Sequence, residues 1–359
     1  MSLLSYILWS VDPDIFVIPW IDHPVRWYGF LFAMGFILSQ QVMFYVFRKD
    51  GRDEKEVETL TIYMVVAVVV GARLGHCLFY DPIYYLSNLH KILYVWEGGL
   101  ASHGGAIGML IAIYLFARKM PGMTYFWALD RLAIVTCLTG ALIRTGNFTN
   151  SEMIGTPTAS FTGVVFVENI KTGLMYTYPQ IEDIDFQRNQ TTTVDGEGIM
   201  PVTAIIEFKP ETNTTLDINR IKNAFQRDSY YSDYVDSNYD VTFNTYQSDE
   251  VSYGELNFIG VARHPAQLYE AFYCVILFLL LFHIWYWYRH KLNEGFAFGL
   301  FLTLLWSLRF LDEFVKLNQE PWEEGLPLNM GQMLSIPMII IGITVMIRVG
   351  MWKKVEPEK

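Results

Sequence analysis

Long apolar segments constrain this chain more than any other feature of its sequence. A helix of about 20 mostly apolar residues is long enough to cross the hydrocarbon core of a bilayer. Segments of this kind recur along the 359 residues, of which only 18% are charged. They cover residues 27–47, 57–80, 100–117, 126–143, 268–288, 295–315 and 332–352. The sequence therefore predicts an α-helical polytopic membrane protein with seven transmembrane helices.

The charges between these segments predict how the helices are oriented. Basic residues follow the first, third, fifth and seventh segments, and they include Arg48, Lys49, Arg118, Lys119, Arg289, Lys291, Lys353 and Lys354. The other loops are neutral or acidic, with Glu320, Glu323 and Glu324 after the sixth segment. Because basic loops stay in the cytoplasm, we expect the N-terminus outside and the C-terminus in the cytoplasm. Met1 is not followed by a basic leader and cleavage site, so we expect no removable signal peptide.

A polar insertion separates the first four predicted spans, in residues 1–155, from the last three, in residues 259–359. Residues 156–258 contain 16 acidic and 6 basic side chains, so nearly all of the net charge of −11 lies there. Alternating apolar residues predict strands at Val202–Phe208 and Tyr239–Tyr246, and a helix is expected at Leu216–Phe225. We expect an inserted extracytoplasmic α/β domain that docks a protein partner or adds stability rather than chemistry.

The most informative polar residues follow the fourth apolar segment. Arg144, Asn147, Asn150 and Glu152 occur in close succession and are followed by Gly155. Polar groups near lipid are expensive, and they are normally retained because they face a partner, a cavity or a ligand. A guanidinium keeps its charge and can grip a phosphate through two parallel hydrogen bonds. Arg144 is therefore the first candidate for binding an anionic group.

Further polar residues lie at the expected outer ends of the spans. Glu270 lies just inside the fifth span, where a carboxylate should pair with a cation such as an arginine. Arg309 and Glu313 lie near the end of the sixth span, and their spacing of four also fits a simple intrahelical pair. His103 opens the third span and could be an interfacial anchor or a proton acceptor. Tyr28 heads the first span, a position more typical of an interfacial aromatic residue.

Several features argue for structural roles or exclude classes of function. Cys77, Cys137 and Cys274 lie inside apolar segments without metal-ligand spacing, which predicts small buried residues. Asp130 and Arg131 lie near the start of the fourth span, where snorkelling or a structural ion pair is favoured over catalysis. The chain has no Walker loop, no G-x-S-x-G and no H-E-x-x-H motif. Nucleotide hydrolysis and the common hydrolase reactions therefore have no support.

Six short motifs follow the order of the seven predicted spans. They are R-W-Y-G at 26–29, H-G-G at 103–105, RTGNFTNSEMIG at 144–155, R-H-P-A-Q-L-Y-E at 263–270, R-F-L-D-E-F at 309–314 and G-Q-M-L-S at 331–335. Together they resemble the motifs of the prolipoprotein diacylglyceryl transferase family, and the combination is specific although no single motif is. The chain departs from the family pattern at Ala141–Ile143, where a glycine is usual before the arginine. It also has Leu305 in place of a common tyrosine, Lys316 in place of an arginine, and a longer insertion.

The resemblance implies a reaction and a cellular setting. The diacylglyceryl group of phosphatidylglycerol would be transferred to the lipobox cysteine of a preprolipoprotein, and glycerol phosphate would leave. The protein would lie in the bacterial cytoplasmic membrane, with its active site near the outer face. It would contact the signal peptide of the preprolipoprotein and membrane lipids, but no nucleic acid, and it would need no metal or organic cofactor.

The resemblance also implies roles for particular residues. The predicted catalytic residues are His103 as the base and Arg144 and Arg309 as stabilisers of the phosphate charge. The predicted substrate-binding residues are Tyr28, Arg144, Asn147, Asn150, Glu152, Gly155, Glu270 and Glu313. The two asparagines and Glu152 are expected to orient the glycerol headgroup or the arginines. Glu270 and Glu313 are expected to hold the arginines rather than to touch substrate.

Two competing classes of function account for some of the same features. A seven-span transporter or receptor also carries intramembrane charges, because ion and substrate pathways are lined by them. In this chain the charges gather at one expected face, and no inverted repeat is visible. A structural membrane protein could use its acidic domain to bind partners. The joint motif pattern favours the transferase over both.

Overall fold

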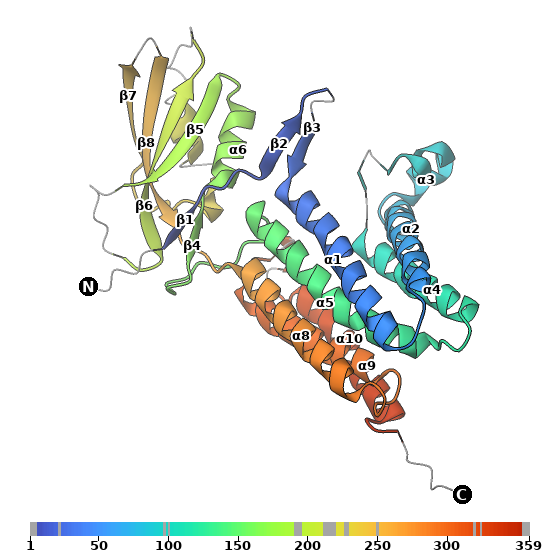
Figure 1. Cartoon of the computed structure of the whole chain (residues 1–359). Helices are drawn as coiled ribbons and strands as arrows, with labels where there is room; N and C mark the ends of the chain where they lie inside the picture. The colour runs from blue at the N-terminus through green and yellow to red at the C-terminus, as the bar shows by residue number, and fades with distance from the viewer. Residues whose placement is uncertain are drawn as a thin grey trace, which may run out of the picture. The chain divides into compact units, whose positions relative to one another are not determined.

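The chain forms two compact units in the computed structural model. The structure describes residues 6–20, 23–95, 98–99, 101–189, 196–210, 220–225, 230–248, 251–318, 321–323 and 325–353. The first unit contains residues 1–32, 142–272 and 309–332, and the second contains residues 33–141, 273–308 and 333–359. By these bounds, residues of both units occur in five helices, which are labelled in Figure 1: α1 (Trp27–Lys49), α5 (Tyr125–Thr149), α8 (Ala266–Tyr288), α9 (Phe296–Asp312) and α10 (Met330–Val349).

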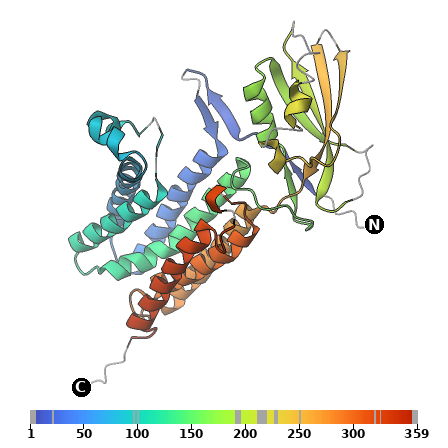
Figure 2. The ribbon, with the colours of Figure 1, turned by 180° about the vertical axis from the view of Figure 1, so that it is seen from behind.

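A four-stranded antiparallel sheet dominates the first unit (Figures 1 and 2). Its strand order is β5 (Ile181–Arg188), β6 (Ile199–Phe208), β8 (Val251–Val261) and β7 (Thr242–Ser248). Burial alternates residue by residue along β6. Because successive side chains of a strand point to opposite faces, this alternation leaves one face of the sheet to be covered.

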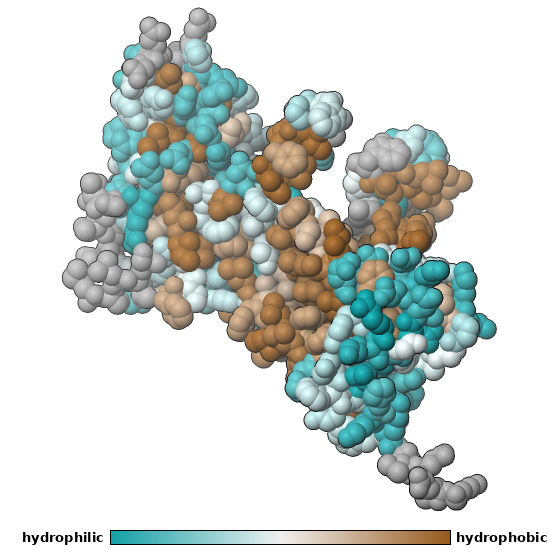
Figure 3. All heavy atoms as spheres, viewed as in Figure 1, coloured by the Kyte–Doolittle hydropathy of each residue, from teal (hydrophilic) through white to brown (hydrophobic). Residues whose placement is uncertain are grey.

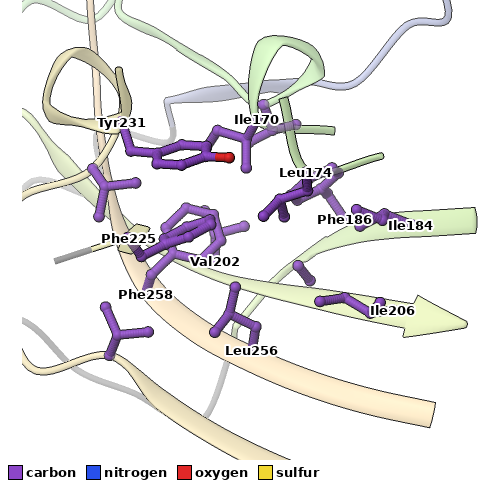
Figure 4. Packing of buried hydrophobic residues seen from close by; sticks show 14 of the residues in the cluster. Ile170, Leu174, Ile184, Phe186, Val202, Ile206, Phe225, Tyr231, Leu256 and Phe258 are labelled. Carbon is purple, nitrogen blue, oxygen red and sulfur yellow. The ribbon is translucent and has the colours of Figure 1, made fainter. Parts of the chain in front are cut away.

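Helix α6 (Glu168–Thr177) covers that face of the sheet. Ile170 and Leu174 lie four residues apart on one side of the helix, and both are fully buried. They belong to one hydrophobic cluster with Val202 of β6 and Phe258 of β8 (Figure 4). Burying a side chain of this size contributes about 1.5–3 kcal/mol, so the cluster is the main core of the first unit.

Short strands near the N-terminus are an element that the sequence analysis did not predict. Strand β1 (Ile7–Trp9) pairs in parallel with β4 (Val164–Phe166), and β2 (Asp14–Ile18) pairs with β3 (His23–Arg26) in an antiparallel hairpin. The indole of Trp9 lies 4.2 Å from the ring of Phe148, measured between ring centroids. Because Phe148 belongs to the last turns of α5, strand β1 supports the end of that helix.

Close helix packing marks the second unit. Helices α2 (Glu54–Phe79) and α4 (Ser102–Lys119) approach through glycines. A Cβ added at Gly71 would lie 2.5 Å from the carbonyl oxygen of Gly104, and one at Gly75 would lie 2.7 Å from the Cα of Gly104. No side chain fits at that distance, so the contact requires glycine. Helix α3 (Pro82–Ser87) and a 3-10 turn at Leu89–Leu93 follow α2.

The described helices have the character of a multi-pass membrane protein. Within the described residues, α1, α2, α5, α8 and α10 are long and apolar enough to cross a membrane. Helices α4 and α9, of 18 and 17 residues, occupy the other two predicted segments. Apolar side chains gather on the surface of the helices (Figure 3), and those of α2 include the exposed Ile62, Val66 and Leu78. Such faces are suited to contact with lipid.

Several predicted boundaries differ from the observed ones. The predicted end of the fourth span at residue 143 is wrong, because α5 continues to Thr149 and includes Arg144 and Asn147. The predicted strands correspond to β6 and, shifted by a few residues, to β7. Residues 220–225 are helical. The beginning of that predicted helix, at 216–219, lies outside the described residues, as do Glu320, Glu324 and Lys354.

A buried ion-pair cluster lies in the second unit. Arg131 Nε lies 2.9 Å from Asp50 Oδ2, and Arg289 Nε lies 3.2 Å from Asp50 Oδ1. The Trp285 indole N–H donates to Asp50 Oδ2 at 3.3 Å, and the Arg131 guanidinium lies 4.2 Å above the Trp127 ring. These five residues are called the Asp50 cluster below. The ion pair predicted for Arg131 is therefore present.

Other residues expected to be structural are also accounted for. Both carboxylate oxygens of Asp130 accept backbone N–H bonds, from Gly295 and Phe298, at 2.8 Å each. These bonds satisfy donors at the beginning of α9 that the helix itself cannot pair. Cys77, Cys137 and Cys274 are free and buried, as predicted.

Candidate active site

The end of α5 adopts a Schellman motif whose left-handed residue is not glycine. The Ser151 N–H donates to Phe148 O at 3.0 Å, and the Glu152 N–H donates to Asn147 O at 2.9 Å, which is the bonding pattern of that motif. Ser151 has φ of 54° and Met153 has φ of 56°. No other non-glycine residue in the described ranges has a positive φ. Such strain persists only where the surroundings fix the backbone, and it often marks functional sites.

A chain of hydrogen bonds runs from this turn back to Arg144. Asn147 Nδ2 donates to Glu152 Oε2 at 2.9 Å, and Asn150 Nδ2 donates to Glu152 Oε1 at 3.1 Å. Arg144 Nη1 in turn donates to Asn147 Oδ1 at 3.3 Å. Four of the predicted site residues are thus brought together by the fold.

Glu270, in the first turns of α8, is the centre of a larger charge cluster. Its Oε2 pairs with Arg144 Nε and lies 4.0 Å from Arg309 Nη1, and its Oε1 pairs with Lys316 Nζ. The prediction that Glu270 pairs with an arginine is therefore confirmed. Lys316 Nζ also lies 3.1 Å from Glu313 Oε1 and 3.2 Å from Asp312 Oδ2. The name Glu270 cluster denotes Arg144, Glu270, Arg309, Asp312, Glu313 and Lys316.

Glu313 connects this cluster to the start of α10. The intrahelical pair considered from the sequence is present, because Arg309 Nη2 lies 3.5 Å from Glu313 Oε1. Asn329 Nδ2 lies 3.3 Å from Glu313 Oε2. A Cβ added at Gly331 would lie only 2.3 Å from Glu313 Cδ. Gly331 therefore leaves the space that the Glu313 carboxylate occupies. This explains why the G-Q motif at 331–335 begins with glycine.

The cluster has buried carboxylates and a more accessible cationic edge. The side chains of Glu270 and Glu313 are each 4% exposed, whereas those of Arg144 and Arg309 are 19% and 24% exposed. A ligand that reaches the cluster therefore meets guanidinium groups before it meets carboxylates. A guanidinium matches the geometry of phosphate oxygens, so the exposed edges of Arg144 and Arg309 can contact a phosphate. The arrangement is suited to hold a phosphate.

Two further predicted site residues serve as packing points. A Cβ at Gly155 would lie 2.5 Å from His264 O and 2.6 Å from Val315 O, so three chain segments meet there with no room for a side chain. A Cβ at Gly146 would lie 3.0 Å from Tyr28 Cα. Tyr28 is therefore held against α5 within the first unit, beside Gly146, which lies between Arg144 and Asn147 in sequence.

His103 belongs to the second unit, at the start of α4. Its ring stacks against Tyr80 at 6.0 Å and meets Phe79 edge-on at 5.5 Å, measured between ring centroids. The imidazole is exposed. These contacts agree with an aromatic anchor. The role of His103 as a base remains a prediction.

The site includes residues that sequence reasoning did not assign to it. Lys316, 3% exposed, is the third cation on Glu270, and its spacing from Asp312 and Glu313 is the helical spacing of charge pairs. Gln267 Nε2 donates to the Glu152 carbonyl, and Asn329 donates to Glu313. Gln267 stands in the motif at 263–270, so the motif was the available signal. Within the described residues, no group of three His, Cys, Asp or Glu side chains could hold a metal ion.

Comparison with known proteins gives a consistent assignment. A family model described as prolipoprotein diacylglyceryl transferase matches residues 14–348. A phosphatidylglycerol–prolipoprotein diacylglyceryl transferase of Tolumonas auensis is 35% identical, over 95% of this chain and 96% of that protein. Proteins with the same name from Porphyromonas gingivalis and Bacteroides fragilis are 34% and 32% identical, over 97% and 99% of this chain and 96% and 99% of their own lengths.

Proposed function

Because the chain belongs to the prolipoprotein diacylglyceryl transferase family, we propose that it transfers the diacylglyceryl group of phosphatidylglycerol to the lipobox cysteine of a preprolipoprotein. The products are a thioether-linked lipoprotein precursor and glycerol phosphate. One observation carries this proposal. Arg144 and Arg309 lie on the same buried carboxylate, that of Glu270, and both remain partly exposed. The pair supports the binding of the phosphodiester of a lipid.

The reaction follows from the charges at this site. The cysteine sulfur attacks the diacylglyceryl carbon that carries the phosphate, and the bond from that carbon to the phosphate oxygen breaks. The bonding electrons move to the phosphate oxygen, so the leaving glycerol phosphate gains negative charge. Arg144 and Arg309 stabilise this charge as it develops. Removing one such donor from a preorganised site costs about 10²–10³-fold in rate.

The turn beyond α5 is suited to orient the glycerol headgroup. Glu152 is exposed and is held by the amides of Asn147 and Asn150. A carboxylate is an acceptor for hydroxyl donors, and the headgroup of phosphatidylglycerol carries two hydroxyl groups. Asn147, Asn150 and Glu152 therefore orient the headgroup while Arg144 binds its phosphate. Glu270 and Glu313 hold the arginines.

His103 is the base in this proposal. The attacking species is the thiolate, and a free cysteine thiol has a pKa of about 8.5, so a base raises the rate at neutral pH. A His103→Gln variant should lose rate most severely at low pH, and raising the pH should partly restore it by ionising the thiol directly. The rate of peptide lipidation between pH 6 and 9 measures this. A pH profile parallel to that of the unchanged protein would assign His103 a structural or headgroup-binding role.

The proposal includes an orientation in the membrane. The spans are α1, α2, α4, α5, α8, α9 and α10, with the N-terminus outside and the C-terminus in the cytoplasm. Arg48 and Lys49 end α1, and Arg118 and Lys119 end α4, which supports the cytoplasmic side for both ends. The inserted residues 156–258 and the Glu270 cluster then lie toward the outer face of the bacterial cytoplasmic membrane. Membrane lipids and the signal peptide of the preprolipoprotein reach the site from within the bilayer.

A direct assay tests the proposed function. The purified protein is mixed with phosphatidylglycerol vesicles and a lipobox peptide, and the mass of the peptide is measured. We expect the mass to increase by one diacylglyceryl group and glycerol phosphate to be released. A peptide with serine in place of the cysteine serves as the control and should remain unmodified. An unchanged cysteine peptide would contradict the proposal and would favour a transporter or receptor with seven spans.

A further inference from the structure

The strained turn after α5 is held by side chains from other parts of the first unit. Asn169 Nδ2, in the first turn of α6, donates to the carbonyl of Ser151 at 3.0 Å. Gln267 donates to the carbonyl of Glu152, and Arg263 Nη1 donates to the carbonyl of Gly155 at 3.1 Å. Three carbonyls between residues 151 and 155 are thus fixed from outside the turn.

Asn169 connects this turn to the core of the inserted residues. Its Nδ2 also donates to the Tyr234 hydroxyl at 2.7 Å, and its carbonyl accepts a bond from the Tyr230 hydroxyl at 3.0 Å. Its neighbour Ile170 is fully buried in the hydrophobic cluster of the sheet. The amide of Asn169 is therefore carried by a rigid element, and it reaches the turn in a fixed direction.

The inserted residues also form one wall of a cavity beside the Glu270 cluster. The cavity, of about 290 Å³, is lined by Met153, Ile154, Asp233, Tyr234, Lys316, Leu317 and Asn318. Tyr234 is thus both a wall residue and a partner of Asn169. Arg263 is paired with Asp233 at 3.2 Å, which fixes the other inserted residue of the wall. Residues of the insertion and Lys316 of the Glu270 cluster therefore line the same cavity.

We propose that Asn169 is a positioning residue for the transfer reaction and that the insertion serves catalysis by holding the strained turn at residues 151–153. This inference rests on the proposed function. Ser151 at φ of 54° and Met153 at φ of 56° keep a conformation that an unconstrained chain would leave. The hydrogen bond from Asn169 to Ser151 is one of the contacts that prevent this. The turn then holds Glu152 against Asn147, and Asn147 against Arg144.

The proposal predicts which kinetic constant changes. Without the bond from Asn169, the turn can relax and Glu152 moves away from Asn147. Arg144 and Arg309 stay on Glu270, so the lipid phosphate still binds. KM for phosphatidylglycerol should therefore change by less than about threefold, whereas kcat should fall by about 10–100-fold because small errors in position act on the transition state.

Four variants test the role of the Asn169 amide. Asn169→Ala removes the amide, and Asn169→Asp keeps its shape but replaces the donor with an acceptor, which cannot bond to the Ser151 carbonyl. Tyr234→Phe removes only the second partner of Asn169, so we expect a smaller loss of kcat. Asn238→Ala is the matched control. Asn238 is an exposed asparagine whose side chain bonds to Asp236 Oδ1 at 2.8 Å, and its loss should leave kcat within twofold.

The outcomes separate this inference from the proposed function. If the unchanged protein transfers lipid and Asn169→Asp has its full kcat, the hydrogen bond to Ser151 has no positioning role and the inference is wrong. A rise in KM of tenfold or more with kcat unchanged would also overturn it, since the residue would then act in lipid binding. If Asn169→Ala does not fold, judged by its thermal unfolding in detergent, Asn169→Asp and Tyr234→Phe decide. No transfer by the unchanged protein would instead refute the proposed function.

Discussion

Two charge clusters in this protein have the same plan but differ in what surrounds their arginines. In the Asp50 cluster one carboxylate binds Arg131 and Arg289, and in the Glu270 cluster one carboxylate binds Arg144 and Arg309. In the first cluster, indole rings lie against the two guanidinium groups, at 4.2 Å and 5.3 Å. The side chains of Arg131 and Arg289 are 8% and 17% exposed, so the contact with indole rings, rather than complete burial, distinguishes this cluster.

The partners of Arg144 are of another kind. Its guanidinium bonds to Asn147 Oδ1 at 3.3 Å and to the Met153 sulfur at 3.0 Å, both of which belong to the strained end of α5. The same charge pattern thus ends against indole rings in one region and in a strained polar turn in the other. The difference teaches that a buried ion pair does not identify a site by itself. The conformation of the groups beside it does.

The largest expected effect is a loss of catalytic rate when lysine replaces Arg144. Arg144→Lys keeps the charge but cannot make planar bidentate contacts, so the rate of peptide lipidation should fall by about 10²–10³-fold. Arg131→Lys is the matched change in the Asp50 cluster and should keep the rate within threefold per folded molecule. Membrane levels of both variants should remain measurable by immunoblot. Full activity of Arg144→Lys would remove the functional difference between the clusters.

A second prediction exchanges the two central carboxylates for amides. Glu270→Gln leaves three cations without their common partner, so we expect an activity loss of about 30–100-fold from misplaced arginines. Asp50→Asn should lower the free energy of unfolding by about 3–5 kcal/mol, because it leaves buried guanidinium groups unpaired, and should change the activity of the folded fraction little. Thermal unfolding and the lipidation rate, measured on the same samples, separate the two effects. If both variants are less stable but keep the normal lipidation rate per folded molecule, the two carboxylates do not differ in function and the comparison fails.

The smallest expected effect concerns stability, and it comes from Glu168, a carboxylate that belongs to neither cluster. Burial raises the pKa of Glu168, at the start of α6, to about 7, and the nearby Asp12, Asp14 and Asp183 raise it further while Lys171 opposes them. As the pH rises from about 4.5 to 7, the unfolded chain releases this proton before the folded chain does, so stability falls.

Glu168→Gln removes that dependence. The variant should unfold at the same or a lower temperature than the unchanged protein near pH 5. At pH 8 it should be more stable by about 1–3 kcal/mol, from the size of the pKa difference. Lipidation activity at pH 7 should be unchanged. Identical slopes of stability against pH in the two proteins would contradict the assignment of a raised pKa to Glu168.

Much of the helical architecture could be predicted from the sequence, because apolar length alone specifies a membrane helix. The end of α5 could not. The apolar segment ends at residue 143, whereas the helix continues to Thr149. It is terminated by Ser151 in the left-handed region, which serine rarely occupies. The strands β1 and β4 were missed because their pairing joins residues far apart in the sequence.

The site was predictable as a set of motifs but not as a geometry. The motifs named Arg144, Glu270 and Arg309, which the fold brings together. Lys316 was recognised as a polar residue near the end of the sixth span and as a departure from the family pattern, but nothing in its local sequence shows that it reaches a carboxylate on another helix. Asn169 could not be found in advance, because an isolated asparagine within a polar insertion has no distinguishing pattern.

The sharing of Glu270 has a consequence for how the protein is assembled. Its partners come from two separate parts of the chain, the end of α5, with Arg144, and the end of α9 with the residues directly after it, with Arg309 and Lys316. Until all of them have arrived, at least one charge remains unpaired in an apolar environment, which costs several kcal/mol. A chain with one of these helices misplaced is therefore penalised before it can bind lipid. The pairing within the cluster therefore depends on the correct arrangement of these helices, and so does the partly exposed edge that Arg144 and Arg309 form.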